Sequence, residues 1–318
     1  MRPHSNDQLT SICVLGLTLW RRAALIGSVT PPIEGMQASL PRMDTIDFIP
    51  LVKAYPALSR KYGEVSCVAG VEMTTDGPSW IRLYPVPFRS LDDDKQFRKY
   101  QTVRVRVTPH RGDLRPETRR PDLESIELRG DPISSKNGWA LRRRFVEPLM
   151  VASMCEITRR QRRDRTSLGV FRPGRVIDLE IEKASVDEGK RQIAKAWVAQ
   201  TSLLDGLGSD ERASQLRELE QAPWTFKYRY ECNEAGCRTH TQSIIDWEIA
   251  QFYRRVRHFD DWRDRMRTRW LDEICGPDRD TAFFVGNMHQ HPRSFLVLGV
   301  WWPPRRPEQL ALADLGNV

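Results

Sequence analysis

Two cysteines and a histidine, Cys232, Cys237 and His240, lie within nine residues of one another. Thiolates and imidazole nitrogens are the ligands that Zn²⁺ prefers, and structural zinc sites hold the ion with four of them in a tetrahedron. The spacing Cys-x4-Cys-x2-His therefore predicts three ligands of a structural zinc site. The alternative is a buried cysteine, an exposed cysteine and a histidine that caps a helix. The spacing is wider than in familiar zinc fingers, and no second cysteine pair follows.

The fourth ligand of such a site must come from another part of the chain. Spacing does not choose among four candidates: Asp246, His258, Cys275 and His289. The six cysteines are scattered, and only Cys232 and Cys237 are close together. This distribution favours a reducing cytoplasm over a disulfide framework.

A strand and a helix must hold these ligands. Residues 225–231 alternate aromatic and polar side chains, which is typical of a half-buried strand, and residues 233–236 favour a turn. Apolar residues then recur at helical spacing from 245 to 256, which predicts a helix capped by Thr241 or Ser243. The predicted order is strand, knuckle and helix, where the knuckle is residues 232–240.

Two carboxylates follow the knuckle and suggest a second kind of chemistry. Asp246 and Glu248, together with His240, could serve as metal ligands or as a general base in an enzyme acting on nucleic acid or a nucleotide. On one helix, however, side chains two residues apart point roughly 200° apart. Both carboxylates could face one site only if the helix began after them, so the enzyme hypothesis ranks below a binding function.

Arginine is concentrated between residues 141 and 175. This segment holds ten arginines and three acidic residues, which accounts for +7 of the chain's net charge of +8. On one continuous helix, Arg144, Arg159, Arg162 and Arg165 would project away from the apolar side chains of the segment. A face of nearly one sign favours contact with phosphates, and the alternative is an ordinary solvated helix face.

The chain becomes strand-rich from Met43 onward. Residues 48–54, 65–72, 80–85 and 102–108 have strand composition, with turn signals between them. In the last of these, valines alternate with Arg104 and Arg106, so one face is apolar and the other cationic. That cationic face could lie along a phosphate backbone, or its arginines could simply be solvated.

The composition agrees with a nucleic-acid-binding protein. The 318 residues are 40% hydrophobic and 29% charged, as in soluble globular proteins, and the pI of about 9.3 favours an anionic partner. The sequence lacks the Gly-x4-Gly-Lys-Ser/Thr motif of P-loop ATPases. We expect DNA or RNA as the partner, in a bacterial cytoplasm and without a membrane association.

These patterns together predict an α+β protein. We expect a β-rich, barrel-like domain over residues 43–138 and a helix-rich domain over residues 139–304, with the knuckle and a C-terminal β-hairpin. Residues 1–42 are expected to be an N-terminal extension that is disordered, or that is not made because the start codon is assigned too early. Residues 305–318 are expected to be a tail.

Several motifs also resemble an uncharacterised bacterial protein family. They are Lys53-Ala54-Tyr55-Pro56 followed by residues 59–64 (SRKYGE), residues 67–71 (CVAGV), residues 80–85 (WIRLYP) and residues 244–248 (IIDWE). The resemblance implies a shared fold over most of the chain after Met43, and it implies no activity.

Overall fold

The computed structural model describes residues 43–59, 63–184 and 222–306. The predicted N-terminal extension and residues 307–318 of the predicted tail lie outside the described residues. So does a helical segment, interrupted at residues 205–209, that the sequence predicts over residues 189–220. The described residues form one compact unit.

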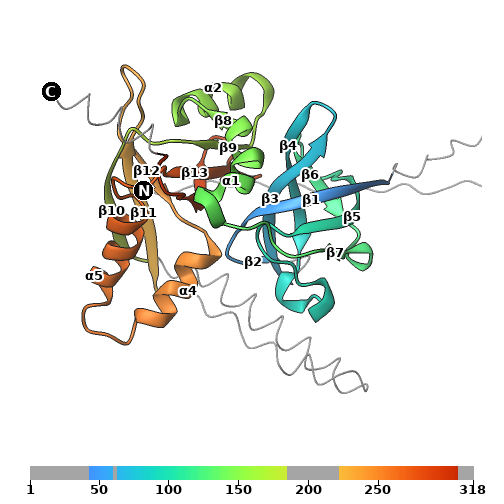
Figure 1. The fold of residues 1–318 in the computed structure, drawn as a ribbon, viewed down its shortest axis with the longest axis horizontal. Coiled ribbons are helices and arrows are strands. Elements are labelled where there is room, and N and C mark those ends of the chain that lie inside the picture. The colour runs from blue at the N-terminus through green and yellow to red at the C-terminus, as the bar shows by residue number, and fades with distance from the viewer. Residues whose placement is uncertain (1–42, 60–62, 185–221, 307–318) are drawn as a thin grey trace, which may run out of the picture. The chain divides into compact units, whose positions relative to one another are not determined.

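Five strands close into a barrel in the N-terminal part, as the sequence predicted (Figure 1). They are β1 (Asp44–Lys53), β3 (Gly63–Thr74), β4 (Gly77–Val86), β6 (Thr118–Pro121) and β5 (Thr102–Pro109), in the order of their pairing. The barrel closes because β5 pairs with β1 as well as with β6. Closure leaves no unpaired edge among these five strands. Two shorter strands lie outside this path: β2 (Ala57–Ser59) pairs with β3, and β7 (Glu127–Arg129) pairs with β5.

The alternation in β5 places its valines inside the barrel. Val103 and Val105 are fully buried, while Arg104 and Arg106 are exposed. Gly70 allows β1 and β3 to approach closely, because a Cβ at this position would lie 2.1 Å from the Ile49 carbonyl oxygen. The barrel core therefore depends on two sequence features. One is the alternation of apolar and polar residues in β5, and the other is a glycine at position 70.

Two further sheets follow the barrel in the sequence. One is antiparallel and consists of β10 (Arg175–Lys183), β11 (Trp224–Glu231) and β12 (His240–Ser243). The other runs in the order β14 (Phe295–Trp301), β13 (Ala282–Asn287), β9 (Leu168–Phe171) and β8 (Met150–Val151). The hairpin of β13 and β14 confirms the predicted C-terminal strand pair.

Four α-helices lie among the described residues after the barrel: α1 (Lys136–Val146), α2 (Met154–Asp164), α4 (Trp247–Val256) and α5 (Trp262–Arg267). Shorter helical turns are η1 (Phe88–Ser90), η2 (Asp93–Lys95), η3 (Leu123–Ser125), η4 (Glu147–Leu149) and η6 (Thr268–Glu273). Figure 1 shows α5 alongside strands β10 and β11.

The condition set for the arginine face is not met, and one helix prediction was wrong. The arginine-rich segment is not one continuous helix, because α1 ends before Pro148 and a new helix, α2, is capped by the Ser153 hydroxyl. The helix after the knuckle does not begin near Thr241 or Ser243. Those residues belong to β12, where pairing with β11 fixes an extended backbone, and Asp246 caps α4 instead.

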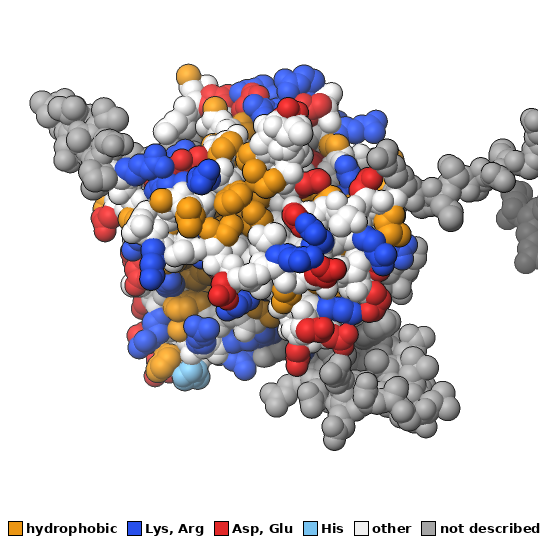
Figure 2. Space-filling view, turned by 45° about the vertical axis from the view of Figure 1, so that its right-hand side comes forward, with side chains coloured by type: hydrophobic (Ala, Val, Ile, Leu, Met, Phe, Trp, Pro, Cys, Tyr) orange, Lys and Arg blue, Asp and Glu red, His pale blue; other side chains and the backbone are white. Residues whose placement is uncertain are grey.

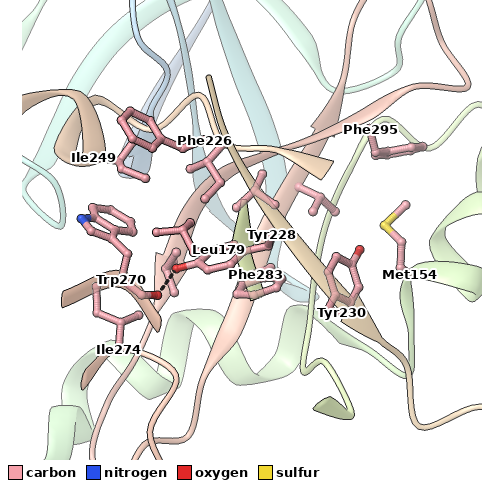
Figure 3. Packing of buried hydrophobic residues seen from close by; sticks show 14 of the residues in the cluster. Met154, Leu179, Phe226, Tyr228, Tyr230, Ile249, Trp270, Ile274, Phe283 and Phe295 are labelled. Atoms are coloured by element: carbon pink, nitrogen blue, oxygen red, sulfur yellow. Dashed lines mark hydrogen bonds between the residues drawn. The ribbon is translucent and has the colours of Figure 1, made fainter. Parts of the chain in front are cut away.

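Strand β11 supplies the centre of the largest hydrophobic cluster (Figure 3). Its residues Phe226, Tyr228 and Tyr230 are buried, which confirms the predicted half-buried strand. The Tyr228 ring stacks on Phe283 of β13 at 4.7 Å, and its hydroxyl donates to the Trp270 carbonyl oxygen. These aromatic contacts fix β11, and with it the start of the knuckle, against the neighbouring sheet.

Candidate metal centre

The structure brings the three predicted ligands together with a fourth side chain, Cys155. The ligand atoms of Cys155, Cys232, Cys237 and His240 all lie within 4.8 Å of one another, so this group could hold a metal ion. The Cys155 and Cys237 sulfurs are 3.6 Å apart. The His240 Nε2 lies 3.5 Å from the Cys155 sulfur and 3.2 Å from the Cys237 sulfur.

These separations agree with the edges of a small tetrahedron. Bond lengths of about 2.3 Å to sulfur and about 2.0 Å to nitrogen place tetrahedral sulfurs about 3.8 Å apart, and sulfur and nitrogen about 3.5 Å apart. The donor set of three thiols and one imidazole suits a soft or borderline ion. Four protein ligands complete a tetrahedron, which is the arrangement of structural rather than catalytic sites.

Strands β11 and β12 position three of the ligands. Cys232 follows directly after β11, Cys237 lies in the connection, and His240 is the first residue of β12. The Cys237 backbone N–H donates to the Glu234 carbonyl oxygen, which closes a tight turn between the two cysteines. The His240 ring stacks on Tyr230 of β11, so its orientation is set by the same strand that leads to Cys232.

Helix α2 positions the fourth ligand, because Cys155 lies in its first turn. The Ser153 hydroxyl accepts the Glu156 backbone N–H and donates to the Glu234 carboxylate in the knuckle. Arg159, one turn farther along, donates to the same carboxylate at 2.6 Å. Glu234 therefore ties the start of α2 to the knuckle from two positions.

Burial keeps three side chains of the Cys/His group neutral in the absence of a metal ion. Burial raises the pKa of the Cys155 thiol to about 12, and the neighbouring Cys237 thiol adds to the effect. Burial also raises the pKa of Cys232, although the backbone N–H groups of Met154 and Cys155 oppose this. Burial lowers the pKa of His240, which keeps its imidazole neutral and able to bind a metal. A cation would replace the thiol protons and remove the cost of burying thiolates.

The four candidates for the fourth ligand have other contacts. Cys275 lies 3.6 Å from the Trp270 carbonyl oxygen, and the His258 ring packs on Phe259. His289 Nδ1 lies 3.3 Å from the Asp113 carboxylate. Asp246 caps α4.

Cys155 is 77 residues before Cys232, so spacing could not suggest it. One local signal was present: residues 153–156 read Ser-Met-Cys-Glu, a capping-box pattern that places Cys155 in the first turn of a helix.

The candidate catalytic residues form two separate sets. His240 belongs to the Cys/His group, while Asp246 and Glu248 contact Lys99, whose Nζ lies 3.6 and 2.9 Å from their carboxylates. The helix begins between the two acids, so they do reach one partner, contrary to the expectation from helical geometry. Burial raises the pKa of Asp246 to about 6, and Lys99 opposes that shift. This contact joins α4 to the segment before β5.

The predicted nucleic-acid-binding arginines divide by their contacts. Arg104 makes two hydrogen bonds of 2.9 Å with its cross-strand partner Asp47, and Arg106 pairs with Asp122 at 2.7 Å. Arg159 is held by Glu234 and Glu156. The remaining three, Arg144, Arg162 and Arg165, are exposed and make no ion pair with a described residue. Figure 2 shows Lys and Arg side chains interspersed with Asp and Glu over the face in view.

Two families of unknown function cover the described part of the chain. Residues 45–148, which include the barrel, match the family described as "Domain of unknown function (DUF8758)". Residues 150–316, more than half of the chain, match "Domain of unknown function (DUF8757)". The chain belongs to the DUF8757 family. All four residues of the Cys/His group lie within that match.

The two matches meet near residue 149, and the domain boundary at residues 138 and 139 stays a prediction. A search among curated proteins found no match. Within residues 43–59, 63–184 and 222–306, no helix is both long enough and apolar enough to cross a membrane.

Proposed function

We propose that this protein binds nucleic acid through the exposed arginines of helix α2 and that a zinc ion at the Cys/His group fixes this helix in place. The observation that carries the proposal is that one helix holds both features. Cys155 lies in the first turn of α2, Arg162 in its last turn, and Arg165 caps its C-terminal end. The metal ligand at one end thus anchors the cations at the other.

The charge on α2 supports an anionic partner. Arg162 and Arg165 are exposed and unpaired among the described residues, whereas Arg159 and Arg160 are paired with Glu156. An exposed arginine without a carboxylate can neutralise a phosphate and release its counterions, which is the main sequence-independent source of affinity for nucleic acid. Arg144 on α1 is a further exposed cation of this kind.

The alternative, a metal-dependent enzyme using His240, Asp246 and Glu248, has less support. His240 faces the thiols of Cys155 and Cys237. The two carboxylates share a lysine, whose positive charge disfavours a metal cation at the same position. A centre with four protein ligands also leaves no open position for a substrate or an activated water.

The test is a binding titration with duplex DNA and with single-stranded RNA over a range of salt concentrations. The variant Arg162→Gln/Arg165→Asn removes two charges, and asparagine tolerates the left-handed conformation of Arg165. If both arginines lie on phosphates, the log–log salt slope for duplex DNA should flatten by about 2 units, because each contact contributes about 0.9.

The matched control is Arg104→Gln/Arg106→Gln, which changes the net charge equally but removes arginines that are already paired with aspartates. We expect its salt slope to stay close to that of the wild type. Equal slopes for both variants and the wild type, with all three proteins folded, would refute a role of α2 in phosphate contact.

A further inference from the structure

A cavity of about 240 Å³ lies beside the knuckle and is lined by Arg172, Arg279 and Arg305 together with Asp280, Gly174 and Asn233. The volume is smaller than the roughly 300–1,000 Å³ of pockets that enclose a whole small-molecule ligand. It therefore suits one charged group of a larger molecule better than an entire nucleotide.

The single carboxylate in this cavity is already neutralised. Asp280 receives hydrogen bonds from Arg172 at 2.5 and 3.0 Å and from the buried Arg143 at 2.8 Å. Burial raises its pKa, but these two arginines outweigh the burial and bring it to about 2. Asp280 thus remains an anion with two partners of its own and leaves the other arginines of the cavity unpaired.

Arg279 and Arg305 are the cations without a carboxylate partner among the described residues. Both are half-buried, and they lie on neighbouring backbones, because Arg279 forms a bridge with Pro304 and the Arg305 Nε donates to the Arg279 carbonyl oxygen. The Arg279 guanidinium also lies 5.1 Å from the centre of the Trp302 ring. Both side chains line the cavity, so an anion bound there would meet two positive charges that are not neutralised by a carboxylate.

Gly174 places the cavity directly against the metal centre. A Cβ at Gly174 would lie 2.3 Å from the Asn233 side-chain oxygen and 2.8 Å from its backbone nitrogen, so only glycine permits this contact. Asn233 directly follows the metal ligand Cys232, and the Gly174 backbone N–H donates to the Glu231 carbonyl oxygen. The knuckle that holds the Cys/His group is therefore also a wall of the cavity.

We propose that this cavity binds a terminal phosphate, a phosphate monoester held by Arg279 and Arg305. A monoester carries close to two negative charges and three strong acceptor oxygens, which match two guanidinium groups. A phosphate monoester is a terminal group. It can therefore enter the cavity while the rest of the molecule stays outside. The source of the phosphate is either the phosphorylated end of a nucleic acid strand or a free nucleotide.

The experiment compares one single-stranded DNA sequence carrying either a 5′-phosphate or a 5′-hydroxyl, together with adenosine monophosphate and inorganic phosphate as separate ligands. We expect the full chain to bind the phosphorylated strand at least about tenfold more tightly, because hydrogen bonds between charged groups are the stronger kind. Arg279→Gln/Arg305→Gln should abolish that preference and leave affinity for the hydroxyl strand unchanged. Arg279→Lys/Arg305→Lys keeps both charges and should retain part of it.

The α2 variant Arg162→Gln/Arg165→Asn separates this proposal from the proposed function. It should weaken binding of both strands equally and keep the preference for the phosphorylated one. If neither strand binds but adenosine monophosphate or inorganic phosphate binds in a manner that needs Arg279 and Arg305, the proposed function fails and the phosphate site stands. The proposal of a phosphate site would be overturned if the two strands bind with equal affinity and the Arg279 and Arg305 substitutions change the affinity for none of the phosphate-containing ligands.

Discussion

Replacing Cys155 by serine is the most direct test of the metal centre, because this residue joins helix α2 to the knuckle. The wild-type chain should purify with one zinc ion per molecule. Serine keeps the size of the side chain but replaces a thiolate with a hydroxyl that does not ionise near neutral pH. The variant should therefore bind zinc through only the three ligands of the knuckle.

The size of the effect can be bounded from the contacts of the centre. Loss of a partner that only supports a ligand already lowers metal affinity by about 10- to 100-fold. Loss of a ligand itself should exceed about 100-fold, which corresponds to more than about 2.7 kcal/mol. Since metal-binding energy in such sites is folding energy, the free energy of unfolding in the presence of zinc should fall by at least that amount. Ser153 and Arg159 still tie α2 to Glu234, so we expect a folded, weakened protein.

The assay combines metal content, competition with a chromophoric chelator, and unfolding followed by circular dichroism with and without EDTA. Cys275→Ser is the matched control, because this cysteine lies outside the group and contacts the Trp270 carbonyl oxygen. The control should keep its zinc. A Cys155→Ser protein with wild-type zinc affinity would refute the assignment of the fourth ligand. Wild-type protein whose unfolding is unchanged by EDTA, and which holds no metal, would refute the centre itself.

Two further predictions concern the residues around the cavity. Asp280→Asn removes one of the two carboxylates paired with the buried Arg143 and leaves Glu147 as the other, so unfolding at pH 7 should become easier by about 2 kcal/mol in chemical denaturation. The pKa of Asp280 in the folded protein, about 2, lies below the usual value of about 3.9. The carboxylate therefore contributes to the free energy of unfolding above pH 4, and this contribution should vanish as the pH falls toward 2. A stability difference between the wild type and the variant that stays constant with pH would contradict this. Gly174→Ala should displace Asn233 and lower zinc affinity in the chelator assay, whereas Gly112→Ala, whose Cβ would meet only His110 atoms at 3.6 Å or more, should have no effect.

Regular alternation was the part of the fold that could be predicted. The valines of β5 recur with a period of two over five residues and the aromatic residues of β11 over seven, and both segments are strands with one buried face. Short strands were missed for the opposite reason. The two residues of β8 and the four of β12 are extended because a neighbouring strand pairs with them, and a few residues carry too little pattern to indicate this.

The start of helix α4 could not be predicted from capping residues alone, because strand pairing occupies two of the possible caps. Thr241 and Ser243 are good capping residues, yet both pair with β11, and Asp246 takes the role because its side chain accepts the Glu248 backbone N–H. Because Asp246 is the capping residue, the angle expected between the side chains of Asp246 and Glu248 does not apply. Asp246 lies outside the helix in extended backbone, so its angle to Glu248 is not set by the helical repeat, and Lys99 reaches both.

The candidate site was predictable only as far as local spacing extends. Cys232, Cys237 and His240 are close in sequence and stay close in the fold, whereas Cys155 joins them through helix α2. The arginine count likewise predicted the positive charge of the segment but not which arginines are exposed and unpaired. Arg159, for example, forms an ion pair with Glu234 of the knuckle. Only Arg162 and Arg165 remain free on α2 among the described residues. In the proposed function the helix would therefore serve at both ends, with Cys155 of the first turn in the Cys/His group and the two exposed arginines at the other end available to phosphates.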